Sequence, residues 1–118
     1  MDTPAVVTYT YRYPMESPTP QLLELSANAE EILGYPESAW RADPYLWQRL
    51  LHPEDAQEAI AATWRTTFQQ VAYDLTYRMV TRDSRILWIR DTATVEVLPD
   101  RAEIWRGSWT VIPEPDAG

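Results

Sequence analysis

Residues 71–112 hold three runs in which apolar and polar residues alternate, and these runs are separated by two short turns. The runs cover residues 71–81, 86–98 and 103–112, and the turns read "RDSR" and "PDRA". Alternation with a period of two is typical of a strand with one buried face. Such short turns join antiparallel neighbours, because parallel strands need a long crossover. This part of the chain therefore predicts a three-stranded antiparallel meander.

Two further strands are predicted near the N-terminus. Residues 6–13 alternate Val and Tyr with Thr and Arg, and residues 21–26 form a second, shorter apolar run. Between them lies "PMESPTP", whose three prolines cannot continue a ladder or a helix.

The segment between the two groups of strands predicts helices. Asn28 and Glu31 have the spacing of a capping box, and Gly34 stands where a left-handed residue ends a helix. Residues 43–51 predict a second short helix. The longest helix is predicted over residues 53–69, where apolar residues recur every three or four positions. We expect this stripe to face the core through three large side chains: Ile60, Trp64 and Phe68.

The order of the elements predicts an α+β fold. It consists of a five-stranded antiparallel sheet with a block of short helices and one longer helix packed on one face. A chain of 118 residues suits a single domain over residues 1–118, with a core at 6–113 and a tail at 114–118.

Composition excludes several classes of function. The chain has no cysteine, which removes disulfides and thiol chemistry, and its ten basic residues are all arginine, which removes lysine Schiff bases. A net charge of −8 disfavours nucleic acid as a partner. No apolar run is long enough for a membrane span, and the N-terminus is unlike a signal peptide, so we expect a cytoplasmic protein.

Five motifs occur in order along the chain: "SANAEEILGY", "DPYLWQRLLHPED", "YRM", "DSRILWIRD" and "WRG". Together they resemble a PAS domain of the subclass common in bacterial sensor proteins, and the resemblance covers nearly the whole chain. It implies a non-catalytic sensory or protein-interaction module that acts in signal transduction through a partner.

The chain departs from the PAS pattern in two places, and it also lacks the motif of one subgroup. Ser84 replaces a turn glycine, so this turn must be slightly strained or of another type. The terminal Asp-Ile-Thr is absent, and Pro113 and Pro115 disfavour the helix that leads to an effector in relatives, so output would need a partner surface if the chain is complete. The Asn-Cys motif of flavin-binding members is missing. We expect a colourless protein with no flavin, haem or metal.

The single histidine, His52, precedes Pro53 and two acids. In the resembling family this motif marks the joint between a short and a long helix, and Pro53 suits the first helical position. We therefore interpret His52 as structural, in preference to a haem ligand or a general base.

The aromatic residues leave two interpretations open: a filled core or a pocket for a small molecule between the sheet and the helices. The candidate pocket-lining residues are Tyr11, Trp47, Ile60, Trp64, Phe68, Tyr77, Met79 and Trp109.

The outer face of the sheet is the candidate surface for a protein partner or a weak homodimer. Strand alternation assigns to it Trp88 and Ile104 as apolar anchors, flanked by Arg90 and Arg106. The alternative is that arginine stems cover Trp88 and shield it.

A small cone-shaped α+β enzyme, such as an isomerase or dehydratase, is the alternative function. It would need an inward Asp/His dyad, and the strand pattern predicts only apolar or tyrosine residues at inward positions.

Overall fold

The computed structural model describes residues 5–16, 19–69 and 72–115, with the side chains of residues 68 and 69 left aside. This part of the chain forms one antiparallel sheet in the order β2-β1-β5-β4-β3. The strands are β1 (Val6–Tyr13), β2 (Gln21–Leu25), β3 (Tyr73–Val80), β4 (Ile86–Val97) and β5 (Glu103–Ile112). The predicted strands and the meander at the C-terminal side are confirmed.

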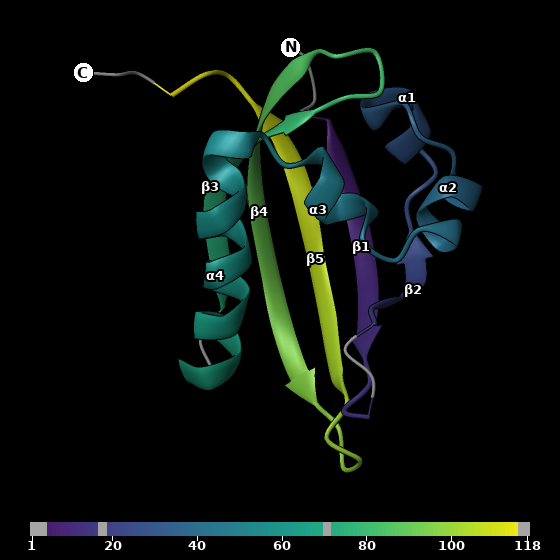
Figure 1. The fold of residues 1–118 in the computed structure, drawn as a ribbon, viewed down its shortest axis with the longest axis vertical. Coiled ribbons are helices and arrows are strands. Elements are labelled where there is room, and N and C mark those ends of the chain that lie inside the picture. The colour runs from purple at the N-terminus through teal and green to yellow at the C-terminus, as the bar shows by residue number, and fades with distance from the viewer. Residues whose placement is uncertain (1–4, 17–18, 70–71, 116–118) are drawn as a thin grey trace.

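Four helices connect β2 to β3: α1 (Ala29–Leu33), α2 (Glu37–Ala42), α3 (Leu46–Leu50) and α4 (Pro53–Gln69). All of them lie on one side of the sheet, with α4 alongside β3 and the short helices toward β1 and β2 (Figure 1). The predicted α+β architecture is confirmed. Within the described residues, no helix is both long and apolar enough to cross a membrane.

The core lies between the helices and the inner face of the sheet. β1, β3, β4 and β5 contribute alternate residues, as the period of two requires. The largest side chains that are fully buried there are Trp40, Trp109, Tyr77, Leu33, Met79, Ile89 and Val7.

The start of α1 differs from the predicted capping box. Asn28 makes no side-chain cap hydrogen bond. Its amide instead donates to the Val6 carbonyl at 2.8 Å and its oxygen accepts from the Ser26 hydroxyl at 2.6 Å, so Asn28 fastens the helix to β1. The end of the helix is as predicted, since Gly34 has a φ of 92° and donates to the Glu30 carbonyl.

The prediction of the buried face of α4 is wrong, because the helix is rotated about its axis and buries a different set of residues. Ala59, Ala62 and Thr66 are buried, whereas Trp64 is 63% exposed. Small residues let the helix backbone lie close to the sheet, and the Tyr73 hydroxyl donates directly to the Ala59 carbonyl at 3.0 Å. Ile60 is half-buried at the edge of this face. The side chain of Phe68 lies outside the described residues.

The β3–β4 turn shows how Ser84 replaces the family's glycine. Ser84 has a φ of 69°, a left-handed conformation that costs more for serine than for glycine. The Thr81 side chain stabilises the turn, because its hydroxyl bonds to Asp83 and accepts from the Arg85 amide.

Candidate functional site

The centre of the inner sheet face holds a carboxylate, Asp91. It is 2% exposed and lies on β4 between Ile89 and Ala93. Three donors from three other strands converge on it. The Tyr9 hydroxyl donates to Oδ1 at 2.6 Å, and the Tyr77 hydroxyl and Trp109 Nε1 donate to Oδ2 at 2.7 and 3.2 Å.

Burial raises the pKa of Asp91 to about 6, because the interior solvates its charge poorly. The donors from Tyr9, Tyr77 and Trp109 oppose this rise by stabilising the carboxylate. No ion pair among the described residues includes Asp91. The site therefore holds a buried negative charge with neutral hydrogen-bond donors in place of a cation.

A short relay connects this carboxylate to the helices. Trp47 on α3 donates its indole N–H to the Tyr77 hydroxyl at 2.8 Å, and this hydroxyl donates in turn to Asp91. The two rings are steeply inclined, at 73° with centroids 6.2 Å apart. A displacement of Trp47 would thus disturb the hydrogen bonds of Asp91.

Because Gly107 has no side chain, the Tyr9 hydroxyl can reach Asp91. The two residues are cross-strand partners, and the Tyr9 ring stacks on Trp109 with centroids 4.5 Å apart. A Cβ on residue 107 would lie 2.5 Å from the Tyr9 hydroxyl and 2.6 Å from the Thr92 carbonyl oxygen. Only glycine leaves this space free.

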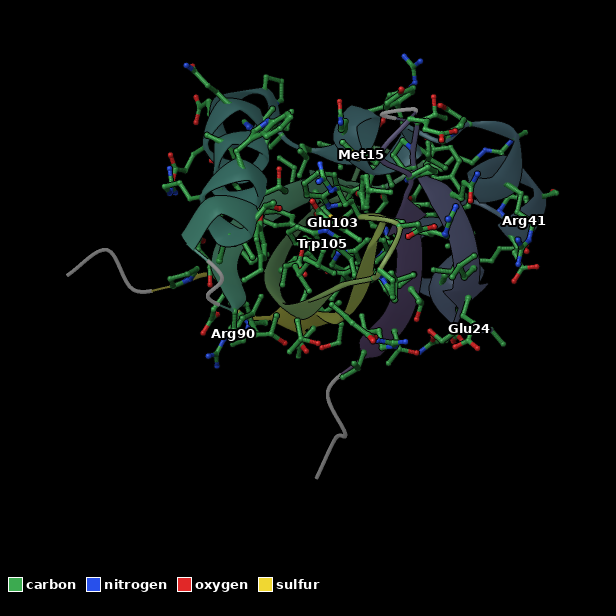
Figure 2. The ribbon with its side chains drawn as sticks, turned by 90° about the horizontal axis from the view of Figure 1, so that it is seen from below. Met15, Glu24, Arg41, Arg90, Glu103 and Trp105 are labelled. Carbon is green, nitrogen blue, oxygen red and sulfur yellow. The ribbon has the colours of Figure 1, made fainter. Side chains whose placement is uncertain are left out.

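Asp91 closes the inner end of a cavity of about 30 Å³. This cavity shares six wall residues with a surface groove of about 470 Å³: Tyr13, Pro20, Tyr45, Trp47, Gln48 and Trp105. In the view from below, Glu103 and Trp105 lie between the sheet and the helices, with Met15 on the helix side (Figure 2). The groove thus leads from the surface toward the buried acid.

The model of the PAS fold family matches residues 22–111. The chain belongs to the PAS fold family. Among curated proteins, a search found no match.

Solved structures share the fold of this PAS domain at low sequence identity. The N-terminal domain of a diguanylate cyclase with PAS/PAC sensor from Marinobacter aquaeolei is 21% identical, with a TM-score of 0.75 over 89% of this chain and 93% of that one. A domain of a putative light and redox sensing histidine kinase from Haloarcula marismortui is 16% identical, with a TM-score of 0.69 over 95% and 93%. A sensory box histidine kinase/response regulator from Burkholderia thailandensis is 17% identical, with a TM-score of 0.64 over 89% and 76%.

The residues predicted to line a pocket of this PAS domain fall into four groups, with Trp47 in two of them. Tyr11, Trp47 and Trp109 line the inner cavity, and Trp47, Ile60 and Trp64 line the groove. Tyr77 and Met79 are buried but are not wall residues of either space. Phe68 belongs to the undescribed side chains.

Sequence reasoning missed the residue at the centre of the site. The prediction that inward strand positions are only apolar or tyrosine is wrong, because Asp91 is inward. The alternation of inward and outward residues along β4 places position 91 inward, and this pattern could have revealed Asp91. Trp105, a wall residue of both spaces, was missed in the same way on β5.

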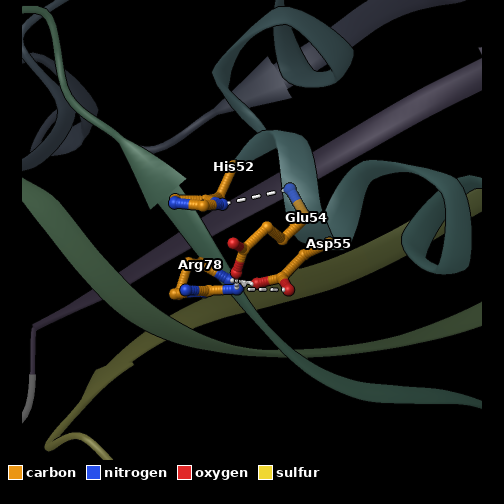
Figure 3. Close-up of polar contacts among 4 residues, drawn as sticks. All are labelled: His52, Glu54, Asp55 and Arg78. Atoms are coloured by element: carbon orange, nitrogen blue, oxygen red, sulfur yellow. Dashed lines mark hydrogen bonds and ion pairs between the residues drawn. The ribbon is translucent and has the colours of Figure 1, made fainter.

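The predicted structural role of His52 agrees with its contacts (Figure 3). Its Nδ1 accepts the Glu54 amide at 3.1 Å, and its own amide donates to the Arg78 carbonyl at 2.9 Å. Asp55 accepts the Arg78 amide and guanidinium, and the guanidinium hydrogen bond lowers the pKa of Asp55. The His-Pro-x-Asp motif of this PAS domain therefore fastens α4 to the edge strand β3. His52 and Asp91 form no dyad.

Of the two predicted apolar anchors on the outer sheet face, Ile104 is buried and Trp88 is half-buried. Ile104 is only 6% exposed, and its neighbours on that face, Arg12 and Glu96, are each held in an ion pair. The Arg78 guanidinium lies 5.2 Å from the centroid of the Trp88 ring, which agrees with the shielding alternative. The other two candidate interface residues form cross-strand ion pairs, Arg90 with Asp74 and Arg106 with Glu96.

Proposed function

We propose that this PAS domain is a sensory module that binds a small molecule between its sheet and helices α3 and α4, without catalysis. The observation that carries the proposal is the groove that leads through an aromatic cavity to the buried Asp91. A buried acid that lacks a counter-charge costs folding stability, and such groups concentrate at functional sites.

The hydrogen bonds of Asp91 supply a route for a signal. A ligand in the groove would touch Trp47, which is bonded through Tyr77 to the carboxylate. The donors to this carboxylate come from β1, β3 and β5, so a change there would reach most of the sheet. The names of the solved relatives, which include a PAS/PAC sensor and a sensory box kinase, support this function.

A screen of small molecules against a blocked variant tests the proposal. Thr63 on α4 lines the groove, so Thr63→Trp would fill it, whereas Gln57→Trp puts the same ring on the exposed face of the same helix. We expect compounds that raise the melting temperature of the wild type and of Gln57→Trp but not of Thr63→Trp. If no compound stabilises the wild type, or if every stabilising compound is unaffected by Thr63→Trp, the proposal is wrong.

We also propose that the output partner, a protein or a second copy of the chain, binds weakly through the outer face. Trp88 is shielded there and the surrounding residues are ion-paired, which suits a polar and reversible interface. Sedimentation velocity over a range of concentrations would show the homodimer. Arg106→Glu should weaken it, and Arg49→Glu, which also breaks an ion pair but lies on α3, should not. A protein that stays monomeric throughout would exclude the homodimer.

A further inference from the structure

Asp91 lines the inner cavity and keeps an unused acceptor position. The donors of Tyr9, Tyr77 and Trp109 are all directed at Asp91, and the Trp47 indole N–H is directed at Tyr77. A carboxylate offers about four acceptor positions, of which three are used here. A ligand that reaches Asp91 therefore meets a free acceptor position and a negative charge.

The mouth of the groove repeats this pattern with a second carboxylate. Glu103 Oε1 accepts the Trp105 indole N–H at 3.0 Å and the Thr67 hydroxyl at 3.1 Å. Its other carboxylate oxygen has no hydrogen bond among the described residues. Arg101 is the single basic residue among the described walls of the groove.

The walls between the two carboxylates are aromatic rings that meet at steep angles. Trp105 is inclined by 63° to Tyr13 and by 68° to Tyr73, with centroids about 6 Å apart in both pairs. Tyr13, Trp47 and Trp105 are wall residues of both the cavity and the groove, so a group at the junction lies among three aromatic rings. The faces of aromatic rings attract cations, and aromatic cages are a common way to bind quaternary ammonium groups.

We infer that the ligand of this domain is a small organic cation, an amine or quaternary ammonium compound, held at the junction of groove and cavity by Tyr13, Trp47 and Trp105 with Asp91 behind them. The inference rests on the proposed function, because it names the chemical class that the same site binds. An anion would be repelled by both carboxylates.

The size of the two spaces fixes where the cation lies. To hold one water molecule, a cavity needs at least about 10–15 Å³ that the centre of the molecule can occupy. The inner cavity of about 30 Å³ therefore admits one or two waters or a single donor group. The bulk of the ligand must lie in the groove of about 470 Å³.

Isothermal titration with matched probes tests the inference. The charged probes are tetramethylammonium, choline and propylamine, and the uncharged control is 3,3-dimethyl-1-butanol, which has nearly the shape of choline. We expect at least one cation to bind, and choline to bind at least about tenfold more tightly than its uncharged counterpart if it is that cation.

Variants locate the binding site. Asp91→Asn removes the charge with little change of volume, and Asp74→Asn removes a carboxylate from the opposite face as a control. Trp47→Leu removes one wall of the junction and keeps the inference testable if Asp91→Asn fails to fold. Cation affinity should fall about tenfold or more in the site variants and stay unchanged in Asp74→Asn.

Three results would overturn the inference: no probe cation binds, choline and its uncharged counterpart bind equally, or binding survives both site variants. None of these results bears on the proposed function, which the small-molecule screen tests independently. The inference therefore fails separately from the proposal of a ligand-binding sensory module.

Discussion

Two aspartates on neighbouring strands, Asp91 on β4 and Asp74 on β3, occupy opposite faces of the same sheet. Asp74 is exposed and bonded to Arg90 at 2.8 Å, and this contact lowers its pKa. Asp91 is 2% exposed and bonded only to neutral donors, and burial raises its pKa to about 6. The same side chain is thus easily ionised on one face and costly to ionise on the other.

The difference separates structure from function in this domain. The outer face pairs its charges across strands, as in Arg90 with Asp74 and Arg106 with Glu96, which costs little and contributes little. The inner face holds an acid whose charge is satisfied by tyrosine and tryptophan donors at a cost in stability. Such an arrangement is expected where a site is kept for a ligand.

The largest expected effect is the loss of stability on removal of Asp91. Asp91→Ala leaves the donors of Tyr9, Tyr77 and Trp109 buried without an acceptor, and we expect a loss of about 3–5 kcal/mol. Asp74→Ala breaks only an exposed ion pair and should cost less than about 1 kcal/mol. Urea unfolding of both variants measures the contrast. Equal losses would show that the two faces do not differ as described.

The pH dependence of stability should also have opposite signs for the two aspartates. Asp91 has a pKa of about 6 in the folded state and about 3.9 when unfolded, so the folded state binds more protons between these values. The destabilisation caused by its charge is therefore present at pH 7 and is relieved as the pH falls toward 4, by about 3 kcal/mol in total. Asp74 has a lowered pKa, so the stability it contributes is lost as the pH falls through its folded pKa.

Urea unfolding of the wild type and of Asp91→Asn at pH 7 and pH 5 isolates this effect. The wild type should gain stability relative to the variant at the lower pH. Parallel changes in the two proteins would contradict the raised pKa of Asp91.

A further variant weakens the inner face without removing a charge. In Gly107→Ala the new Cβ would collide with the Tyr9 hydroxyl and with the fixed Thr92 carbonyl, so the bond from Tyr9 to Asp91 must shift. We expect a loss of about 1–3 kcal/mol, typical of overpacking. The control is Ser108→Ala, the next residue along β5, which faces outward and should change stability by less than about 1 kcal/mol. If Gly107→Ala were well tolerated, the Tyr9 hydroxyl would be able to reach Asp91 without the space at residue 107.

The fold could be predicted because its signals are local. The alternation of β3, β4 and β5 and their short turns determine an antiparallel meander whatever the helices do. The left-handed Gly34 and the start of α4 after His52 follow in the same way from a few adjacent residues. The capping box failed because Asn28 has a competing partner on β1 that is distant in sequence.

The site could be predicted only in part. The alternation Leu87, Ile89, Ala93 already marks position 91 as inward, so Asp91 was detectable as an acid at a core position. Whether the aromatic residues fill the core or leave a cavity depends on the packing of α3 and α4 against the sheet, and no local pattern encodes this. The face of α4 was misjudged because bulky Trp64 dominates the apolar pattern, whereas small Ala59 and Ala62 make the contact.

The smallest expected effect concerns Trp64 on α4, where the contrast between inside and outside recurs between two tryptophans of different helices. Its side chain is 63% exposed, so Trp64→Ala should change the free energy of unfolding by less than about 1 kcal/mol. Trp40→Ala is the matched comparison, because Trp40 is 1% exposed and should cost about 3–5 kcal/mol. Trp64 also lines the groove, so its removal should weaken binding of a groove ligand while leaving the fold intact. A large loss of stability in urea would show that Trp64 packs in the core after all.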